Sequence, residues 1–413
     1  MTGFFREGAA LVCDGVALEP LAAAHGTPLY VYSAATIAAR YRAIDEAFAA
    51  VPHAIHYALK ANSTLAITRL LRGLGSYADA NSGGEIDVAL RAGFLPKQIV
   101  FTGVGKTSAE LGYAIDLGVR SINVESPGEI ERIEALSRER KTRTRIAIRV
   151  NPDVDAQTHP HISTGLKTNK FGIAISDVRA LCAQHRGRPN VQIVGVHAHV
   201  GSQITNMEPL TRAATALVDL ARQLALDGTS IEHLDIGGGL GVSYDGNPVP
   251  SAADYAKAVV PVLRESGLEV VLEPGRHIMA PAGALLTRVV DVKSAGADRL
   301  FVVMDAGMTE LIRPMMYNAF HRIEPVHANG AGKVAADIVG PLCESSDTLG
   351  KDRSIPQPNV GDLFAVLDTG AYGSVMASNY NRRLLPAEVL VDSGDARLIR
   401  RRQTLDDVLA LEL

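Results

Sequence analysis

The sequence predicts an α/β protein in which a (β/α)8 TIM-type barrel is joined to a C-terminal all-β domain, a β-barrel or sandwich that also takes an N-terminal strand. Eight short β-rich runs alternate with helical patterns in the first two thirds of the chain, and strand patterns dominate after Pro281. Parallel strands need a crossover between them, usually a helix, whereas antiparallel strands do not. The predicted limits are 34–280 for the barrel and 1–33 with 281–413 for the β domain.

The eight predicted strands are spaced as successive βα units require. They cover 54–59, 76–79, 99–103, 121–124, 145–150, 193–200, 233–237 and 269–273. Amphipathic helical patterns lie between them, for example at 64–74, 127–141 and 252–267. Eight strands with helices between them favour a closed barrel over an open, doubly wound sheet.

The β domain is predicted from the change of pattern after Pro281. Its strand-like runs, such as LFVVMDAG and DLFAVLDTGAYG, are separated by glycine, proline and asparagine rather than by long helices. Residues 1–33 contain TPLYVYS and no helix of note, so we expect this segment to add a strand to the β domain.

The composition limits the class of partner. The 413 residues are 47% hydrophobic, enough for a large core, and the net charge is only −4 with acids and bases interspersed. A chain without a strong basic field has no general attraction for nucleic acid or anionic membranes. The three cysteines are widely spaced, and no apolar run approaches about 18 residues. We therefore expect a cytoplasmic protein that acts on a small molecule.

Reactive side chains gather where a barrel carries its chemistry, at the carboxyl ends of the strands. Each of these residues alone would be read as a loop or capping residue, but together they predict an active site. They are Lys60, Asp79, Arg149, His199, the glycines Gly237, Gly238 and Gly239, and Glu273.

The loops after the seventh and eighth strands predict a phosphate site. They carry GGGLG at 237–241 and EPGR at 273–276, in the two loops that bind phosphate in many barrels. Glycines let backbone N–H groups approach an anion, and Arg276 supplies a positive charge. GGG alone would equally fit a tight turn.

Three other patterns do not predict the sites that they suggest at first sight. TGVGKTS at 102–108 has Val100 where a P-loop needs glycine, and GGGLG has Val242 where a dinucleotide-binding motif needs its last glycine. His197 and His199 share a strand face, as metal ligands do, but no further ligand pattern accompanies them. We expect neither a nucleotide nor a metal.

Six motifs resemble, in order and spacing, the fold-type III pyridoxal-phosphate (PLP) decarboxylases, which are built on an alanine-racemase-like barrel. They are YALKAN (57–62), HVGSQ (199–203), GGG (237–239), EPGR (273–276), GPLCESSD (340–347) and GAYG (370–373). HISTGLKTNKFGI (161–173) and RPMMY (313–317) resemble the diaminopimelate decarboxylase family in particular. The resemblance covers essentially the whole chain.

This resemblance implies PLP as the cofactor and gives roles to the strand-end residues. Lys60 would form the Schiff base in its neutral, nucleophilic form, and Glu273 would pair with the pyridine nitrogen so that the ring withdraws electrons. His199 would stack on the ring, and Asp79 and Arg149 would lie near the cofactor in roles that stay open. The rest of the cofactor contacts would come from Ser202, Gly237, Gly238, Gly239, Pro274, Gly275, Arg276 and Tyr372.

The same resemblance implies conversion of meso-2,6-diaminopimelate to L-lysine and CO2, the last step of lysine biosynthesis. Cys343 would protonate the carbon that loses CO2. The substrate also carries a distal carboxylate, which suits a guanidinium, and a distal ammonium, which suits a carboxylate. The substrate-binding residues would be Arg276, Arg313, Tyr317, Glu344 and Tyr372.

Three alternatives stay open. A decarboxylase of arginine, ornithine or lysine would need only a carboxylate for the distal cation, and a racemase would need a tyrosine in place of Cys343. A regulatory homologue without activity would have no need to keep Lys60, Glu273 and Cys343 together. The resemblance also implies a homodimer in which Cys343 and Glu344 of one chain complete the active site of the other.

Overall fold

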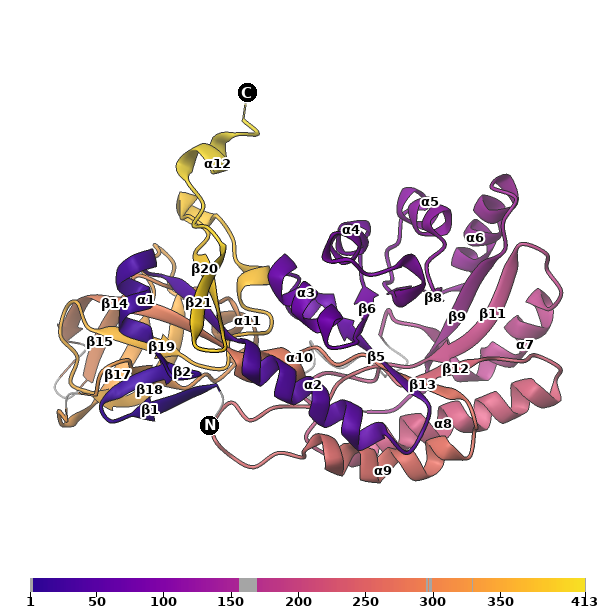
Figure 1. Cartoon of the computed structure of the whole chain (residues 1–413), viewed down its shortest axis with the longest axis horizontal. Helices are drawn as coiled ribbons and strands as arrows, with labels where there is room; N and C mark the ends of the chain where they lie inside the picture. Colours follow the sequence, from indigo (N-terminus) through magenta and orange to yellow (C-terminus); the bar gives the residue numbers. More distant parts are fainter. Residues whose placement is uncertain (1–2, 156–168, 295, 297–298, 329, 413) are drawn as a thin grey trace. The chain divides into compact units, whose positions relative to one another are not determined.

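The computed structural model describes residues 3–155, 169–294, 296, 299–328 and 330–412. The chain divides into two compact units (Figure 1). The barrel unit comprises Arg40–Val242 and Val249–His277, and the β unit comprises Met1–Ala39, Ser243–Pro248 and Ile278–Leu413. The domain limits expected from the sequence, 34–280 for the barrel, stay a prediction. The compact units differ from them mainly in that the short segment Ser243–Pro248 belongs to the β unit.

The barrel unit contains a closed ring of eight parallel strands, as predicted. Neighbouring strands pair in chain order, β13 pairs with β5, and β8 pairs with β9, so the sheet has no free edge. The strands are β5 (His53–Ala58), β6 (Tyr77–Ala80), β7 (Ile99–Phe101), β8 (Ser121–Val124), β9 (Thr144–Asn151), β11 (Val191–His197), β12 (His233–Asp235) and β13 (Glu269–Leu272). A two-residue strand, β10 (Ile173–Ala174), pairs with β9 outside this ring.

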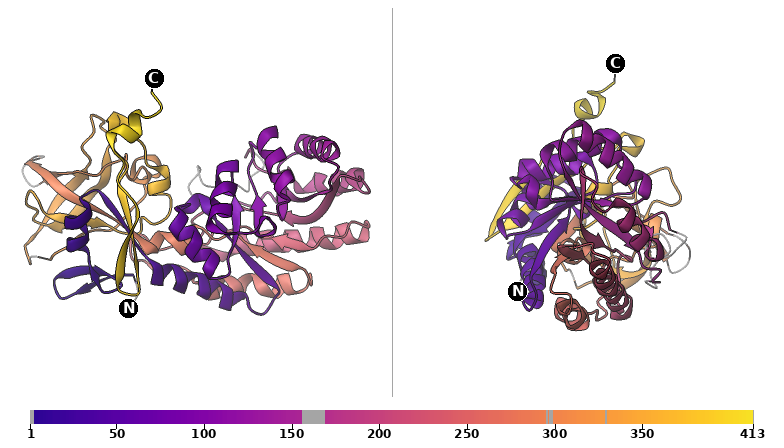
Figure 2. Two further views of the ribbon diagram at one scale, coloured as in Figure 1. Left: turned by 45° about the horizontal axis from the view of Figure 1, so that its top comes forward. Right: turned by 90° about the vertical axis from the view of Figure 1, so that its right-hand side faces the viewer.

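Helices surround the strands, as the end-on view in Figure 2 shows. Several begin at a side-chain cap that the sequence supplies, such as Ser82, Thr107, Ser126 and Ser251, each of which accepts a backbone N–H of the first turn. The helices are α2 (Ala34–Phe48), α3 (Leu65–Gly73), α4 (Gly83–Ala92), α5 (Ser108–Leu117), α6 (Pro127–Glu139), α7 (Ile175–His185), α8 (Met207–Leu226), α9 (Ala252–Arg264) and the short α10 (Arg276–Met279).

The strands of the barrel read as nearly continuous apolar runs because both of their faces are buried. Ile122, Ile146 and Ile148 are fully buried, and so are the helix residues Leu217 and Leu224 of α8, which pack on the sheet's outer side. This core fixes the carboxyl ends of the strands and therefore fixes the side chains that follow them.

The β unit contains the strands predicted after Pro281 together with an N-terminal strand. β4 (Leu29–Ser33) lies between β14 (Gly283–Ser294), with which it is antiparallel, and β20 (Ala387–Asp392), with which it is parallel. The same sheet includes β15 (Arg299–Met304), β16 (Ile323–Pro325), β17 (Lys333–Val339), β18 (Thr348–Pro356), β19 (Leu363–Val366) and β21 (Asp395–Arg400). A separate small sheet is formed by β1 (Phe4–Glu7), β2 (Ala10–Cys13) and β3 (Val16–Ala17).

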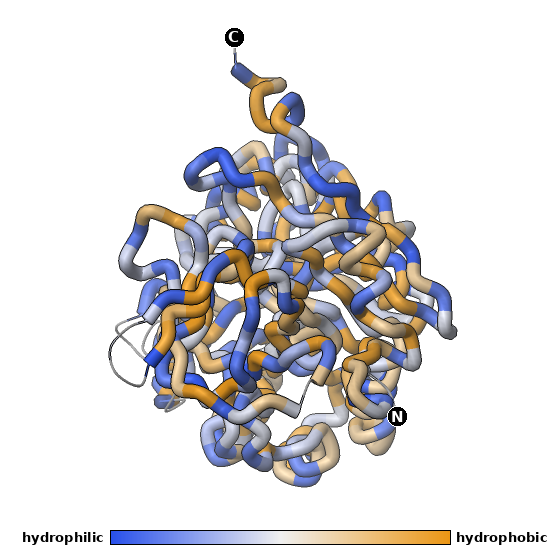
Figure 3. Tube along the Cα trace, turned by 90° about the vertical axis from the view of Figure 1, so that its left-hand side faces the viewer, coloured by the Kyte–Doolittle hydropathy of each residue, from blue (hydrophilic) through white to orange (hydrophobic). Residues whose placement is uncertain are grey.

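Short helices complete the β unit. They are α1 (Leu18–His25), α11 (Arg313–Tyr317) and α12 (Leu405–Leu409). The expectation of no helix of note before residue 34 was wrong, because Leu18, Leu21 and Ala22 of α1 are buried in the apolar core of this unit. Figure 3 shows hydrophobic and hydrophilic residues alternating along the chain on this side of the molecule. None of the helices in the described part of the chain combines the length and apolar content needed to cross a membrane.

Candidate active site

Lys60 and Asp79 form an ion pair at the carboxyl ends of two neighbouring strands. Lys60 lies in a single 3-10 turn directly after β5, and its Nζ is 3.3 Å from Asp79 Oδ2 at the end of β6. The Lys60 side chain is 37% exposed, whereas that of Asp79 is fully buried. Burial and the charge of Glu273 raise the pKa of Asp79, and the positive charge of Lys60 opposes that rise. Asp79, whose role the sequence left open, is therefore the counter-ion of Lys60.

Glu273 is a buried carboxylate that follows β13. Its Oε2 lies 3.3 Å from Nε2 of His197, a fully buried residue at the end of β11. Burial alone would raise the pKa of Glu273, but the neighbouring His197 ring and the charge of Lys60 lower it well below its usual value. Glu273 is thus an anion at neutral pH. Its neighbour His197 was considered from the sequence only as a possible metal ligand.

His199 is fixed by the glycine turn after β12. The Gly238 N–H donates to His199 Nδ1 at 3.3 Å, so the ring proton of a neutral His199 lies on Nε2. Burial and the positive charges of Lys60 and Arg149 lower the pKa of His199 to about 3. The imidazole is therefore neutral in the physiological range and presents an uncharged aromatic face.

The glycine run forms a turn in which no side chain fits. A Cβ on Gly237 would lie 2.7 Å from the Ala198 carbonyl oxygen, and one on Gly239 would lie 2.6 Å from that of Gly201. A Cβ on Gly238 would overlap the carbonyl oxygen of Glu273. Gly237 and Gly239 also have positive φ angles, which glycine adopts without strain. The turn is thus a bare backbone surface of the kind that binds anions.

Arg276 is linked to this turn through Ser202, which follows the Gly201 whose carbonyl oxygen faces Gly239. It is 7% exposed, and its Nε and Nη2 donate to Ser202 Oγ at 3.3 and 3.1 Å. The two residues come from the loops after β13 and β11, and the structure brings them together. Pro274 and Gly275, between Glu273 and Arg276, are buried as well.

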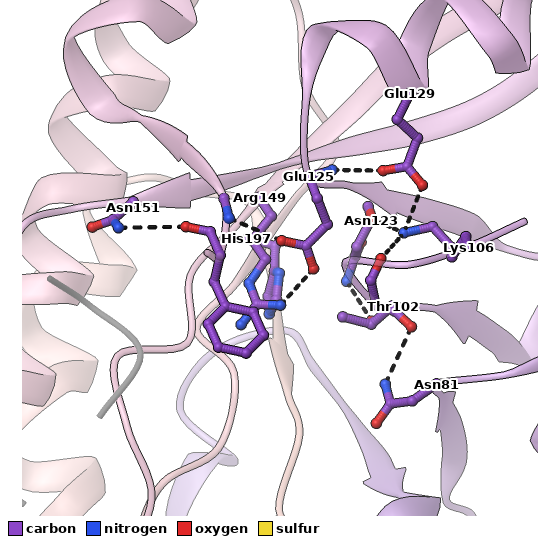
Figure 4. A network of polar contacts seen from close by, with 12 residues as sticks. Asn81, Thr102, Lys106, Asn123, Glu125, Glu129, Arg149, Asn151 and His197 are labelled. Carbon is purple, nitrogen blue, oxygen red and sulfur yellow. Dashed lines mark hydrogen bonds and ion pairs between the residues drawn. The ribbon is translucent and has the colours of Figure 1, made fainter. Parts of the chain in front are cut away.

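Arg149 belongs to a buried network of polar side chains (Figure 4). Its Nη1 is 2.6 Å from Glu125 Oε1, and its guanidinium lies 4.6 Å from the centre of the Phe171 ring. The Glu125 N–H donates to Glu129, whose other carboxylate oxygen is 3.0 Å from Lys106 Nζ. Lys106, from the TGVGKTS segment, is therefore a buried structural cation that helps to hold Arg149. The predicted motif at 161–173 lies largely outside the described residues.

In the β unit, Arg313 is buried and rigidly held. Its Nη1 donates to His321 Nε2 at 2.7 Å, and the His321 Nδ1–H donates to the Leu367 carbonyl oxygen at 2.8 Å. The guanidinium also lies 4.6 Å from the centre of the Tyr244 ring. A charged group that is 5% exposed and held from two sides is suited to binding a carboxylate.

Cys343 and Glu344 are exposed on a turn that Asp347 organises. The buried Asp347 carboxylate accepts the N–H groups of Leu342 and Met308 at 2.8 and 2.6 Å. Its backbone closes the turn, because Asp347 N–H donates to the Glu344 carbonyl oxygen at 3.0 Å. Asp347, the last residue of the GPLCESSD motif, therefore fixes the turn that carries Cys343 and Glu344, a role that was not predicted from the sequence.

Tyr372 and Tyr317 are half-buried residues of the β unit. Tyr372 has a φ of 55°, a left-handed conformation that is uncommon outside glycine, within the GAYG turn. Non-glycine residues persist in such conformations where the surrounding structure holds them, often at functional sites. Here Gly370 and Gly373, on either side, leave no room for side chains.

The predicted residues thus form two sets, one in each unit. The barrel unit brings together Lys60, Asp79, His199, Ser202, Gly237, Gly238, Gly239, Glu273, Pro274, Gly275 and Arg276, with Arg149 near His199, and the β unit carries Arg313, Tyr317, Cys343, Glu344 and Tyr372. The roles of His197 and Asp347 were not predicted from the sequence. His197 stands out as a polar residue at the end of a largely apolar strand, whereas Asp347 lies in a polar segment that gives no such signal.

Comparison with known proteins identifies the family. Residues 34–280 match the family described as "Pyridoxal-dependent decarboxylase, pyridoxal binding domain". The chain is 45% identical over 403 residues to the diaminopimelate decarboxylase of Neisseria meningitidis serogroup A, covering 98% of this chain and 99% of the relative.

Solved structures agree with this comparison over nearly the full length. The crystal structure of diaminopimelate decarboxylase from Helicobacter pylori complexed with L-lysine has a TM-score of 0.92 and 40% identity, covering 96% of this chain and 99% of that one. The diaminopimelate decarboxylase of M. jannaschii in co-complex with L-lysine has a TM-score of 0.95 and 37% identity, covering 100% and 99%. The chain therefore belongs to the diaminopimelate decarboxylase family of the pyridoxal-dependent decarboxylases.

Proposed function

We propose that this chain decarboxylates meso-2,6-diaminopimelate to L-lysine and CO2 with PLP as cofactor, the last step of lysine biosynthesis. The observation that carries the proposal is the Lys60–Asp79 ion pair, placed at the strand ends with the buried Glu273 and the glycine turn. The substrate is proposed because full-length relatives are named diaminopimelate decarboxylase. Buried Arg313 supports it, since a guanidinium held in this way suits the distal carboxylate that distinguishes this substrate from the simple basic amino acids.

The residues of the barrel unit fit PLP. The bare turn of Gly237 to Gly239, with Arg276 beside it, suits the phosphate, because backbone N–H groups and a guanidinium both bind phosphate oxygens. Glu273 Oε1 is buried and has no hydrogen-bond donor among the described residues, so it is able to accept one from a protonated ring nitrogen. Ser202, Pro274, Gly275 and Tyr372 would complete the cofactor contacts.

The roles of the chain's own groups follow from their surroundings. When bound, PLP withdraws electrons from the reacting carbon as CO2 leaves. Glu273 would hold a proton at the ring nitrogen by its negative charge, and the neutral His199 would pack against the ring without adding a charge. Lys60 supplies the nucleophilic amine, and Asp79 orients it. Arg149 lowers the pKa of His199 and so helps to keep that ring neutral.

The β unit supplies the groups for the substrate. Arg313 would bind the distal carboxylate with Arg276 and a hydrogen bond from Tyr317, and Glu344 would pair with the distal ammonium. Tyr372 would contact both cofactor and substrate. The Cys343 thiol would give a proton to the carbon that has lost CO2, for which its exposure on the Asp347 turn is suitable.

The proposed function is tested by measuring CO2 release from meso-diaminopimelate, arginine, ornithine and lysine with the purified protein and added PLP. We expect release from meso-diaminopimelate to be about a hundredfold faster than from the others, because a charge-assisted pair with a buried cation contributes roughly 2 to 5 kcal/mol. Comparable release from ornithine or lysine would favour the alternative decarboxylase, and no release from any substrate would favour the regulatory homologue.

Gly238→Ala is expected to weaken PLP binding by about tenfold or more. The new Cβ would overlap the Glu273 carbonyl oxygen, and overpacking of this kind costs about 1–3 kcal/mol. The measurement is the PLP dissociation constant by equilibrium titration. Gly105→Ala is the matched control, because nothing lies within 4 Å of a Cβ there. Equal PLP affinities in the two variants would contradict the role given to the turn.

We further propose a homodimer in which Cys343 and Glu344 serve the active site of the partner chain. Lys60→Ala and Cys343→Ala are each expected to be inactive. Unfolded together and reassociated at random, half of the dimers should be mixed, and each should contain one native site of two, restoring roughly a quarter of wild-type activity. If subunit exchange is confirmed by mass spectrometry and no activity returns, the shared site is wrong.

A cytoplasmic location is proposed together with this function. Free thiols persist in a reducing compartment, and the three cysteines are unpaired, two of them buried.

A further inference from the structure

Asp235 is a buried residue that contacts the glycine turn and lies close to Glu273. It is the last residue of β12 and is 1% exposed. Its Oδ1 accepts the Gly237 N–H at 2.9 Å, and the Gly237 carbonyl oxygen in turn accepts the Glu273 N–H at 2.8 Å. One side chain therefore contacts the turn proposed for the phosphate and faces the carboxylate proposed for the ring nitrogen.

The second oxygen of Asp235 faces Glu273. One side-chain nitrogen or oxygen atom from each of His197, Asp235 and Glu273 lies within 4.8 Å of the other two, and all three residues are buried. Neither Asp235 Oδ2 nor Glu273 Oε1 has a hydrogen-bond donor among the described residues. Two buried carboxylates at this separation repel each other when both are charged, and the repulsion is removed when one of them keeps a proton and donates it to the other.

The surrounding charges decide which carboxyl keeps the proton. Glu273 has His197 and Lys60 as positive or hydrogen-bonding neighbours, and its pKa is lowered. Asp235 faces the carboxyl groups of Glu273 and Asp79 as well as Tyr255, and a ring nitrogen of His197 lies within 4.8 Å of its carboxyl group. Burial first, and then the charge of Glu273, raise the pKa of Asp235 well above its usual value. The proton therefore belongs on Asp235.

We propose that Asp235, as a neutral carboxylic acid, is a positioning residue that donates a hydrogen bond to Glu273 and accepts one from the Gly237 turn. A neutral donor orients the Glu273 carboxylate without cancelling the negative charge that the ring nitrogen needs. It also ties the two ends of the cofactor site to one rigid strand end. The inference rests on the proposed cofactor site but does not depend on which amino acid is decarboxylated.

The test compares Asp235→Asn with Asp235→Ala. The asparagine side chain would keep both interactions, because its oxygen accepts from Gly237 and its NH2 group donates to Glu273, whereas alanine keeps neither. We expect the Asn variant to bind PLP within about threefold of wild type and the Ala variant to bind it about ten to a hundredfold more weakly. The visible circular dichroism per bound PLP, which reports a fixed orientation, should fall in the Ala variant alone.

Glu134→Gln is the matched control, because it replaces another buried carboxyl group of the barrel unit by an amide, one that accepts from Asn190 at 2.7 Å. It should change thermal stability without changing PLP affinity or dichroism. If the Asn variant binds PLP as weakly as the Ala variant, Asp235 acts as an anion and the proposal is wrong. Wild-type affinity in the Ala variant would also overturn it.

Elemental analysis covers the remaining possibility. One equivalent of a divalent metal that is bound by wild type and lost in Asp235→Asn would assign the His197, Asp235 and Glu273 group to a cation and overturn the proposal. All of these experiments measure the binding of PLP or metal and not turnover. Their results would therefore still test the role of Asp235 if the protein proved not to decarboxylate meso-diaminopimelate.

Discussion

Lys60→Ala is expected to abolish decarboxylation, with a loss of more than about 10⁴-fold, and to remove the visible absorbance of covalently held PLP. Among the described residues of the barrel unit, Lys60 supplies the amine that ends a strand and pairs with the buried Asp79, and we expect no other lysine to replace it. The measurements are CO2 release and the absorbance spectrum after removal of free PLP by gel filtration.

Two further variants separate chemistry from charge. Lys60→Arg keeps a positive charge beside Asp79 but is not deprotonated at physiological pH, so we expect it to lose the absorbance as well. Lys97→Ala, at an exposed lysine of the same unit, should behave as wild type. An unchanged spectrum in Lys60→Ala would show that another lysine carries the cofactor.

Arg313→Met is expected to lower kcat/KM for meso-diaminopimelate by about 30-fold to several thousand-fold. The change leaves the distal carboxylate without its charge-assisted partner, which costs roughly 2 to 5 kcal/mol in transition-state binding. L-lysine keeps that same carboxylate, because the one that leaves as CO2 comes from the other end of the substrate. Inhibition by L-lysine should therefore weaken in parallel.

Cadaverine gives the control for this prediction, since it has both amines of lysine and no carboxylate. Its inhibition constant should change by less than about threefold in Arg313→Met, and Arg313→Lys should recover part of the affinity for L-lysine. Arg313 also contacts His321 and Tyr244, so a structural loss would weaken both inhibitors alike. Equal weakening would thus remove Arg313 from the substrate site.

The strands and helices of the barrel could be predicted because their signals are local. The run EVVLE at 269–273, for example, is a largely apolar segment with β-branched residues, and the structure has β13 at Glu269–Leu272. β10 could not be predicted, since a two-residue strand has no periodicity. The helix Leu18–His25 was not predicted because it contains Pro20. Proline usually indicates a turn in a sequence, but it is tolerated in the first turn of a helix.

The candidate site was predictable where a reactive residue ends a strand, and not where its function depends on a neighbour. Lys60 and Glu273 were found by position alone. His197 and Asp235 end buried strands that are distant from residue 273 in the sequence, and only closure of the barrel brings them to Glu273. Asp347 receives a hydrogen bond from the N–H of Met308, 39 residues earlier, and no pattern in the sequence relates the two.

The position of β4 has a consequence for synthesis on the ribosome. Leu29–Ser33 is completely buried, and both strands that flank it, β14 and β20, follow the entire barrel in the sequence. This buried strand is made before the barrel and therefore has two unpaired edges until β14 and then β20 have emerged from the ribosome. During that interval the nascent chain exposes LYVYS to other chains, so any truncation that removes Ala387–Asp392 should aggregate even though the whole barrel has been made.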